Sequence, residues 1–224
     1  MKFYSVFLIL LLIQFDSSAQ HEAKKMQHID DDLANGKTTI SKILSDKNWM
    51  TLHPMTEFRQ IIKKQARPEK VTMVTEDEPG KKITVKAVVK TTSGVLLKNV
   101  LVYLYHTCNK GWYATDRPHV SGNEGDYGHA RLFAYLKTND QGEFEISTIL
   151  PKGYPDSDLP AHIHIQMWKD GKNLPGVPGE LLFDEDERLT PERKQRALRD
   201  GYLVEKNEGT ATKPVYNYSI IVNN

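Results

Sequence analysis

The sequence predicts a mainly β protein, an antiparallel β-sandwich with an N-terminal helical arm. After residue 76, many short segments alternate apolar and polar residues, and turn-forming residues separate them, which is typical of half-buried strands. Little helical periodicity follows there, so we expect the strands to pack sheet on sheet. Before residue 76, apolar residues such as Ile40, Ile43 and Leu44 recur at helical spacing but are too few for a core of their own.

The expected elements follow from this patterning along the chain. In the first strand, Ile83 and Val85 alternate with lysine and threonine, which predicts one buried face. Thr190 before Pro191 is typical of a helix start and predicts a helix over 191–200. The expected strands lie at residues 83–89, 100–105, 132–137, 143–149, 162–168, 181–183 and 216–222.

The first 19 residues have the pattern of a secretory signal peptide. Lys2 supplies the positive start, an apolar run follows, and Ser17-Ser18-Ala19 gives small residues at a cleavage site. The apolar run is too short to cross a bilayer, which takes about 20 residues. A buried N-terminal helix is the alternative. We expect a secreted or periplasmic protein, with a signal peptide at 1–19, a helical arm at 20–75 and a sandwich domain at 76–224.

Charge and cysteine content exclude several classes of partner and site. Lys and Arg total 30, Asp and Glu total 29, and the net charge of +1 does not indicate nucleic acid or an anionic membrane as a partner. Cys108 is the single cysteine, which excludes an intrachain disulfide and any zinc site built on two or four cysteines of one chain. We therefore expect neither nucleic-acid binding nor membrane association after signal removal.

Two histidines and two tyrosines carry the chemistry. His162 and His164 are alternate residues of an expected strand, so both imidazoles face one side and could bind one ion, although exposed strands often carry such pairs without a metal. Tyr154 and Tyr113 lie on the long irregular segments 150–161 and 109–130, and each alone could be a core residue. Together the four offer two nitrogens and two oxygens, and phenolate favours ferric iron over zinc.

Four motifs, in this order and spacing, resemble those of the intradiol ring-cleavage dioxygenases, non-haem Fe(III) enzymes that open catechols between the two hydroxylated carbons. The resemblance covers about residues 82–186. The motifs are Val102-Tyr103-Leu104-Tyr105 leading to Asn109-Lys110-Gly111-Trp112-Tyr113, then Thr138-Asn139-Asp140-Gln141-Gly142-Glu143-Phe144, then Thr148-Ile149-Leu150-Pro151-Lys152-Gly153-Tyr154-Pro155, and Pro160-Ala161-His162-Ile163-His164.

The resemblance implies a role for each of the four residues. Tyr113 and His162 correspond to equatorial ligands of Fe(3+), and Tyr154 and His164 to axial ligands. Tyr154 would also act as a base, leaving the iron as it takes a proton from the catechol. The implied substrates are a catechol and O2, and the implied product is a muconate-type diacid.

The sequence departs from the family at two positions near these motifs. Leu159 stands where the family usually has an arginine that stabilises the ring anion, and Glu180 falls where the family often has a glutamine. Arg131 or Lys137 could supply a cation instead, but nothing in the sequence places either at the site. His106, His119 and His129 are interpreted as loop or surface histidines.

Two other classes of function compete with the enzyme. One is a binding module that keeps iron or a phenolic ligand but turns over poorly, because Leu159 replaces arginine. The other is a structural sandwich similar to transthyretin-like modules, without a metal, which the presence of all four ligand-type residues disfavours. The helical arm suggests a homodimer, as in many members of the family.

Overall fold

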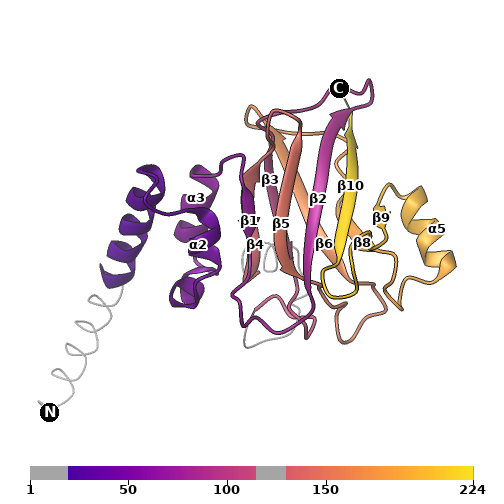
Figure 1. The fold of residues 1–224 in the computed structure, drawn as a ribbon, viewed down its shortest axis with the longest axis horizontal. Helices are drawn as coiled ribbons and strands as arrows, with labels where there is room; N and C mark the ends of the chain where they lie inside the picture. Colours follow the sequence, from indigo (N-terminus) through magenta and orange to yellow (C-terminus); the bar gives the residue numbers. More distant parts are fainter. Residues whose placement is uncertain (1–19, 115–129, 224) are drawn as a thin grey trace, which may run out of the picture.

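The computed structural model describes residues 20–114 and 130–223, and it confirms the predicted β-sandwich (Figure 1). Within these residues the first sheet has the strand order β1-β5-β2-β10, and the second has the order β4-β3-β6-β8-β9 with β7 beside β6. The first sheet consists of β1 (Lys70–Thr72), β5 (Glu143–Ile149), β2 (Lys82–Thr91) and β10 (Val215–Val222). The second consists of β4 (Leu132–Lys137), β3 (Leu101–His106), β6 (His162–Lys169), β7 (Lys172–Asn173), β8 (Glu180–Phe183) and β9 (Leu203–Glu205).

Both sheets are mixed rather than wholly antiparallel. Strand β1 pairs with β5, β10 with β2 and β8 with β9 in parallel, whereas the pairs formed by β2 with β5 and by β3 with β4 and β6 are antiparallel. The alternation of apolar residues marks the two faces of a strand but carries no information on its direction, which depends on the connections. The strands β1, β7 and β9 have only two or three residues, too few to show a pattern.

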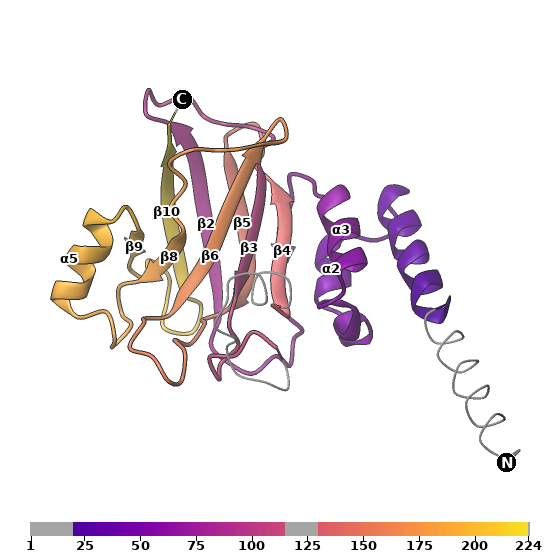
Figure 2. The same cartoon turned by 180° about the vertical axis from the view of Figure 1, so that it is seen from behind.

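The interior of the sandwich follows the alternation in the sequence. On β2, Ile83, Val85, Ala87 and Val89 are buried, and the residues that alternate with them are more exposed. On β3 and β4, by contrast, nearly every residue is buried, which means that both faces of these strands are covered. Figure 2 shows this second sheet from its outer side.

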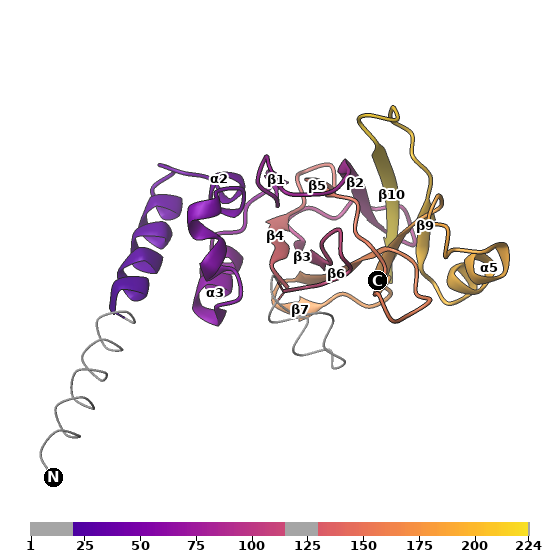
Figure 3. The ribbon, with the colours of Figure 1, turned by 90° about the horizontal axis from the view of Figure 1, so that it is seen from below.

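The N-terminal arm is helical and lies at the β4 end of the sandwich, opposite helix α5 (Pro191–Arg199) (Figure 3). It contains a helix over residues 20–34, then α2 (Ile40–Leu44), the 3-10 helix η1 (Lys47–Leu52) and α3 (Thr56–Lys64). The Arg59 guanidinium of α3 lies 3.9 Å from the centre of the Phe133 ring of β4 and hydrogen-bonds the Tyr103 hydroxyl of β3. The arm therefore covers part of the outer face of the second sheet.

Helix α5 starts at the residue that the sequence predicts. The Thr190 hydroxyl caps it by accepting the amide of Arg193 at 3.4 Å.

No helix in the part of the chain that the structure describes is both long and apolar enough to cross a membrane. The predicted signal peptide at 1–19 lies outside the described residues.

Candidate metal centre

The two predicted histidine ligands project from the outer face of the second sheet. His162 and His164 flank Ile163, which is fully buried on the opposite face of β6. His164 pairs across the sheet with Tyr105 of β3 on one side and with Glu180 of β8 on the other. Because β6 is hydrogen-bonded on both sides, the two imidazoles start from a rigid base.

Tyr113 follows a tight turn after β3. The amide of Gly111 donates to the Cys108 carbonyl at 2.9 Å, and the amide of Cys108 donates to the Trp112 carbonyl at 2.8 Å. Gly111 has a φ of +79°, in the left-handed region that suits glycine. The amide of Arg131 then donates to the Tyr113 carbonyl at 2.8 Å, which fixes the backbone of this tyrosine from a second side.

Tyr154 comes from a second loop, which interlocks with the first. A Cβ built on Gly111 would lie 2.5 Å from the Gly153 carbonyl oxygen, and a Cβ on Gly153 would overlap the Leu159 carbonyl oxygen. A side chain at Gly111 would push the two loops apart, and a side chain at Gly153 would distort the Tyr154 loop itself. The glycines therefore allow the backbone contact that brings Tyr113 and Tyr154 to one place.

The four predicted ligand atoms converge on one point. The Oη atom of Tyr113 lies 2.6 Å from Oη of Tyr154 and 2.8 Å from Nε2 of His164. The Nε2 atom of His162 lies 3.1 Å from both Oη of Tyr154 and Nε2 of His164. Oη of Tyr154 and Nε2 of His164 are 3.4 Å apart. Tyr113, Tyr154 and His162 are buried, and His164 is half-buried.

The four atoms are close enough together to hold a single metal ion. Ligand atoms about 2.0–2.1 Å from one ion, at tetrahedral or near-right angles, lie about 2.9–3.4 Å from each other. The three longer distances fall in this range. The two shorter ones, at Oη of Tyr113, are hydrogen-bond distances that would lengthen around an ion. The Nδ1 atom of His162 is 2.8 Å from the Pro160 carbonyl and donates to it, so Nε2 carries a lone pair. That lone pair points toward Nε2 of His164. A cation bound between the two nitrogen atoms would stabilise this arrangement. Two phenol oxygens and two imidazole nitrogens suit a hard, strongly Lewis-acidic ion such as ferric iron.

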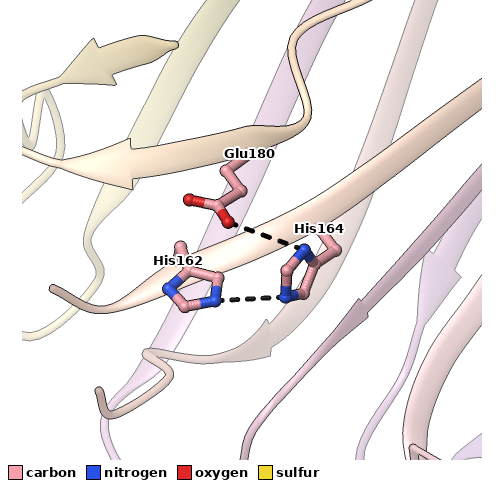
Figure 4. A group of neighbouring side chains, drawn as sticks. All are labelled: His162, His164 and Glu180. Carbon is pink, nitrogen blue, oxygen red and sulfur yellow. Dashed lines mark hydrogen bonds and ion pairs between the residues drawn. The ribbon is translucent and has the colours of Figure 1, made fainter. Parts of the chain in front are cut away.

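Glu180 lies beside the histidines but on the other side of the His164 ring (Figure 4). Its Oε1 atom is 3.9 Å from Nδ1 of His164, whereas the tyrosine oxygens gather at Nε2. Considering only His, Cys, Asp and Glu of the described residues, His162, His164 and Glu180 form the group that could hold a metal ion. At 3.9 Å the carboxylate is too far to accept a hydrogen bond from Nδ1, so Glu180 is an electrostatic neighbour of the His164 imidazole.

The two cations considered from the sequence do not serve the site directly. Arg131 forms a bidentate ion pair with the buried Glu78 carboxylate, with both N–O distances at 2.7 Å. Burial favours a lower pKa for Arg131, but the hydrogen bonds and charge of Glu78 outweigh it and raise this pKa, so the pair stays ionised. Lys137 pairs with Leu101, at the end of β3 and β4 opposite to the site. Leu159 is 52% exposed on the Tyr154 loop.

The prediction that His106 lies on a loop or at the surface is wrong. His106 ends β3 on the interior face, fully buried, where Nδ1 donates to the Thr107 carbonyl at 2.8 Å and Nε2 accepts from the Thr148 hydroxyl at 2.7 Å. Burial lowers the pKa of His106 to about 4, so it is neutral and bridges the two sheets. His119 and His129 lie outside the described residues.

Sequence reasoning missed three residues that support the site. The ring of Tyr105 stacks on His164 with centroids 4.5 Å apart and planes 14° apart. Its place in the alternation of β3, two residues after Tyr103, is a signal that could have been used. Asp186 and Arg188 contact the segments that carry Tyr154 and His162, but they stand in an acidic run that looks like a solvated loop.

The β-sandwich gathers two strand histidines and two loop tyrosines around one point, an arrangement that could hold one metal ion. A family model described as Dioxygenase matches residues 58–222, which is most of the chain. The chain therefore belongs to the dioxygenase family, of the intradiol ring-cleavage type that its motifs resemble. Intradiol dioxygenases are non-haem iron enzymes that cleave catechol rings with O2.

Several solved structures share the fold. The dioxygenase domain of a dioxygenase carbohydrate-binding protein fusion from Streptomyces sp. SirexAA-E is 21% identical, with a TM-score of 0.51, over 70% of this chain and 89% of that one. An intradiol ring-cleavage dioxygenase from Tetranychus urticae is 18% identical, with a TM-score of 0.53, over 70% and 87%. A 3-chlorocatechol 1,2-dioxygenase from Rhodococcus opacus 1CP is 17% identical, with a TM-score of 0.52, over 93% and 99%. No curated protein sequence gives a significant match.

Proposed function

We propose that this protein binds one ferric ion through Tyr113, Tyr154, His162 and His164 and cleaves a catechol-type diol with O2 to a muconate-type diacid. The convergence of four donor atoms within 2.6–3.4 Å of their neighbours is the observation that carries the proposal. One catechol and one O2 account for every atom of the diacid, so the reaction needs no further co-substrate.

A bound ferric ion would supply Lewis acidity toward the two catechol oxygens. The residues of the chain supply the rest. The Pro160 carbonyl holds the tautomer of His162 through a hydrogen bond, and the Glu180 carboxylate, 3.9 Å from Nδ1 of His164, favours a proton on that nitrogen electrostatically. Tyr154 is the proposed base, which is the role that the resemblance to intradiol dioxygenases implies for this residue.

Leu159 supports a preference among catechols. An exposed apolar side chain on the Tyr154 loop offers no positive charge to a ring that gains negative charge in the reaction. Catechols with electron-donating substituents need less of that charge, so we propose that they are cleaved faster than catechol itself. The apolar Leu159 side chain also offers surface to a larger apolar substituent. The same residue favours the second candidate function, an iron- or phenol-binding module with little turnover.

The test compares iron-loaded wild type with Tyr113→Phe, with Tyr216→Phe as the matched control. Tyr216 is buried in β10 of the first sheet. Wild type should bind one iron per chain, show a reddish tyrosinate band and consume O2 as the diacid absorbance rises. Tyr113→Phe should lose the band and, because the metal supplies several kcal/mol, about 10³-fold or more of the activity. A colourless wild type that fills with zinc would contradict the ferric site, and iron binding without O2 uptake on a catechol panel would favour the binding module.

Location and assembly are further parts of the proposal. The N-terminal pattern supports export with cleavage near Ala19, and sequencing the N-terminus of protein from its native host tests it. An intact Met1 in cytosolic material would refute export. The helical arm supports a homodimer, and sedimentation of the mature protein would refute this if it shows monomers only.

A further inference from the structure

The acidic run after β8 reaches back to the predicted metal ligands. Asp186 accepts the amide of Ala161 at 3.1 Å through Oδ2, next to His162, and the amide of Arg188 at 2.9 Å through Oδ1. One carboxylate therefore ties the start of β6 to the connection between β8 and α5. The side chain is half-buried rather than solvated on all sides, unlike the exposed Glu185 and Glu187 beside it.

Arg188 contacts the Tyr154 loop at both of its ends. Its Nη1 atom donates to the Tyr154 carbonyl at 2.9 Å and lies 3.4 Å from the Leu159 carbonyl. A Cβ built on Gly153 would lie 2.5 Å from the same Nη1 atom, so the guanidinium packs directly on the backbone before Tyr154. One cation thus bridges the two ends of a loop whose middle, at Pro155 and Asp156, is exposed.

Helix α5 holds this connection in place. Arg193 forms an ion pair with the Asp158 carboxylate at 3.1 Å, hydrogen-bonds the Asp158 carbonyl and donates to the Arg188 carbonyl at 3.3 Å. The Tyr154 loop is therefore attached to α5 at its tip and to Arg188 at its base. The helix lies far from the N-terminal arm, at the other end of the sandwich (Figure 3).

We propose that Asp186 and Arg188 are positioning residues, a clamp that fixes Tyr154 relative to His162 so that their donor atoms can bind one ion together. This inference rests on the proposed function of the site. Neither side chain offers a ligand atom to the convergence point, since both are engaged with backbone groups. Their effect passes through the backbone of the loop and of β6.

The clamp explains how a loop with an exposed middle can supply a metal ligand. Tyr154 and His162 are eight residues apart, and the chain between them has one internal backbone hydrogen bond, from the amide of Ser157 to the Tyr154 carbonyl at 3.3 Å. Without Asp186 and Arg188, that loop would sample many positions, and binding an ion would cost the entropy of ordering it. Outer partners of this kind typically change metal affinity by about 10–100-fold.

The first experiment uses metal-free protein and measures hydrogen exchange at the amide of Ala161. In Asp186→Ala this amide loses its acceptor and should exchange at least about 10-fold faster than in wild type. Asp184→Ala is the matched control, because Asp184 lies in the same run but pairs with Lys194. Equal exchange in wild type and Asp186→Ala would refute the clamp.

The second experiment measures iron release to a chelator and the tyrosinate band of loaded protein. Arg188→Gln should release iron about 10–100-fold faster and weaken the band, Arg188→Lys should restore part of both, and the exposed Arg199→Gln should match wild type. A merely structural role would lower the melting temperature but leave iron release from folded protein unchanged. Arg188→Gln within twofold of wild type would refute the clamp, and if this variant does not fold, Arg188→Lys decides by the same measurements. If wild type binds no iron, the proposed function fails, whereas the exchange experiment still judges the clamp.

Discussion

The two sheets of the sandwich use their outer faces differently. The outer face of the first sheet meets solvent, and β10 shows this by alternating buried Tyr218 and Ile220 with exposed Ser219 and Ile221. The outer face of the second sheet is covered by the helical arm at one end and by the two tyrosine loops at the other. Its strands consequently bury residues on both sides.

The difference shows where this fold can place a metal site. On the covered face, aromatic rings run from the arm to the site, with Tyr135 stacked on Tyr103, Tyr103 near Tyr105, and Tyr105 stacked on His164. The Tyr105 ring covers one side of the His164 imidazole, so polar groups on this face are partly shielded from water and interact with other groups of the protein. Charges on the solvated face of the first sheet are screened by water, and the same chemistry there would be weak.

The largest expected loss of stability follows from breaking the buried ion pair beneath the Tyr113 loop. Glu78→Gln leaves the charge of Arg131 buried without a counter-ion, and this should lower the free energy of unfolding by about 3–5 kcal/mol. Urea unfolding of metal-free protein measures the change. A decrease in the free energy of unfolding of less than about 1 kcal/mol would mean that water reaches Arg131. This part of the molecule would then resemble the solvated outer face of the first sheet.

Leu159→Arg tests the open rim of the covered face. A guanidinium near the ring should raise turnover of simple catechol by about 10²-fold, because removing such a preorganised charge typically costs 10²–10³-fold. Iron content should not change. Leu198→Arg is the matched control, since Leu198 is equally exposed, at 52%, on α5. Equal turnover by wild type and the arginine variant would mean that another group already supplies the charge.

Acid should destabilise the protein through two neutral histidines buried around the second sheet. Burial lowers the pKa of His53 and of His106 to about 4, against an ordinary value of 6.5. Between pH 6.5 and 4 the unfolded chain takes up these protons and the folded chain does not, so stability falls with falling pH. Each histidine contributes up to about 1.4 kcal/mol per pH unit.

The measurement is the slope of the free energy of unfolding against pH for metal-free protein. His106→Gln keeps a donor and an acceptor and should remove the share of one histidine from this slope. The exposed His28→Gln is its control. An unchanged slope in His106→Gln would show that His106 is not neutral in the folded state.

The smallest effect is expected on the solvated face of the first sheet. Glu145 pairs with Lys70 at 3.2 Å and lies 3.8 Å from Lys86, and both lysine side chains are well exposed. Glu145→Gln should therefore change the free energy of unfolding by about 1 kcal/mol or less, and added salt should make the difference smaller. If Glu145→Gln lowered the free energy of unfolding as much as Glu78→Gln, the outer faces of the two sheets would not differ in the way described.

Strand positions and ligand types were predictable from the sequence because both depend on local pattern. The strands at 132–137 and 143–149 have the predicted bounds, and the alternation around Ile163 places both histidines on one face. The four candidate ligands come together at one point. Pattern and spacing, together with the resemblance to the dioxygenase motifs, predicted that these four residues lie together, and their role as ligands stays a prediction.

The rest depends on contacts between segments that are distant in sequence. His106 was misplaced because its burial comes from Thr148 on the other sheet, 42 residues away. The parallel pairs depend on connections, and β1, β7 and β9 are too short to show a period. Arg188 contacts the Tyr154 carbonyl, 34 residues earlier in the chain. The acidic residues that precede Arg188 give no signal in the sequence of such a contact.

The four candidate ligands differ in the kind of backbone that carries them. His162 and His164 lie on a strand that is hydrogen-bonded on both sides. Tyr113 and Tyr154 lie on loops whose backbones are in contact at two glycines. Half of the centre is therefore anchored and half is adjustable. Substitutions in the two loops can change how an ion and a bound substrate are held without moving the histidines on β6. A family could therefore change its substrates through these loops and keep the histidine strand unchanged.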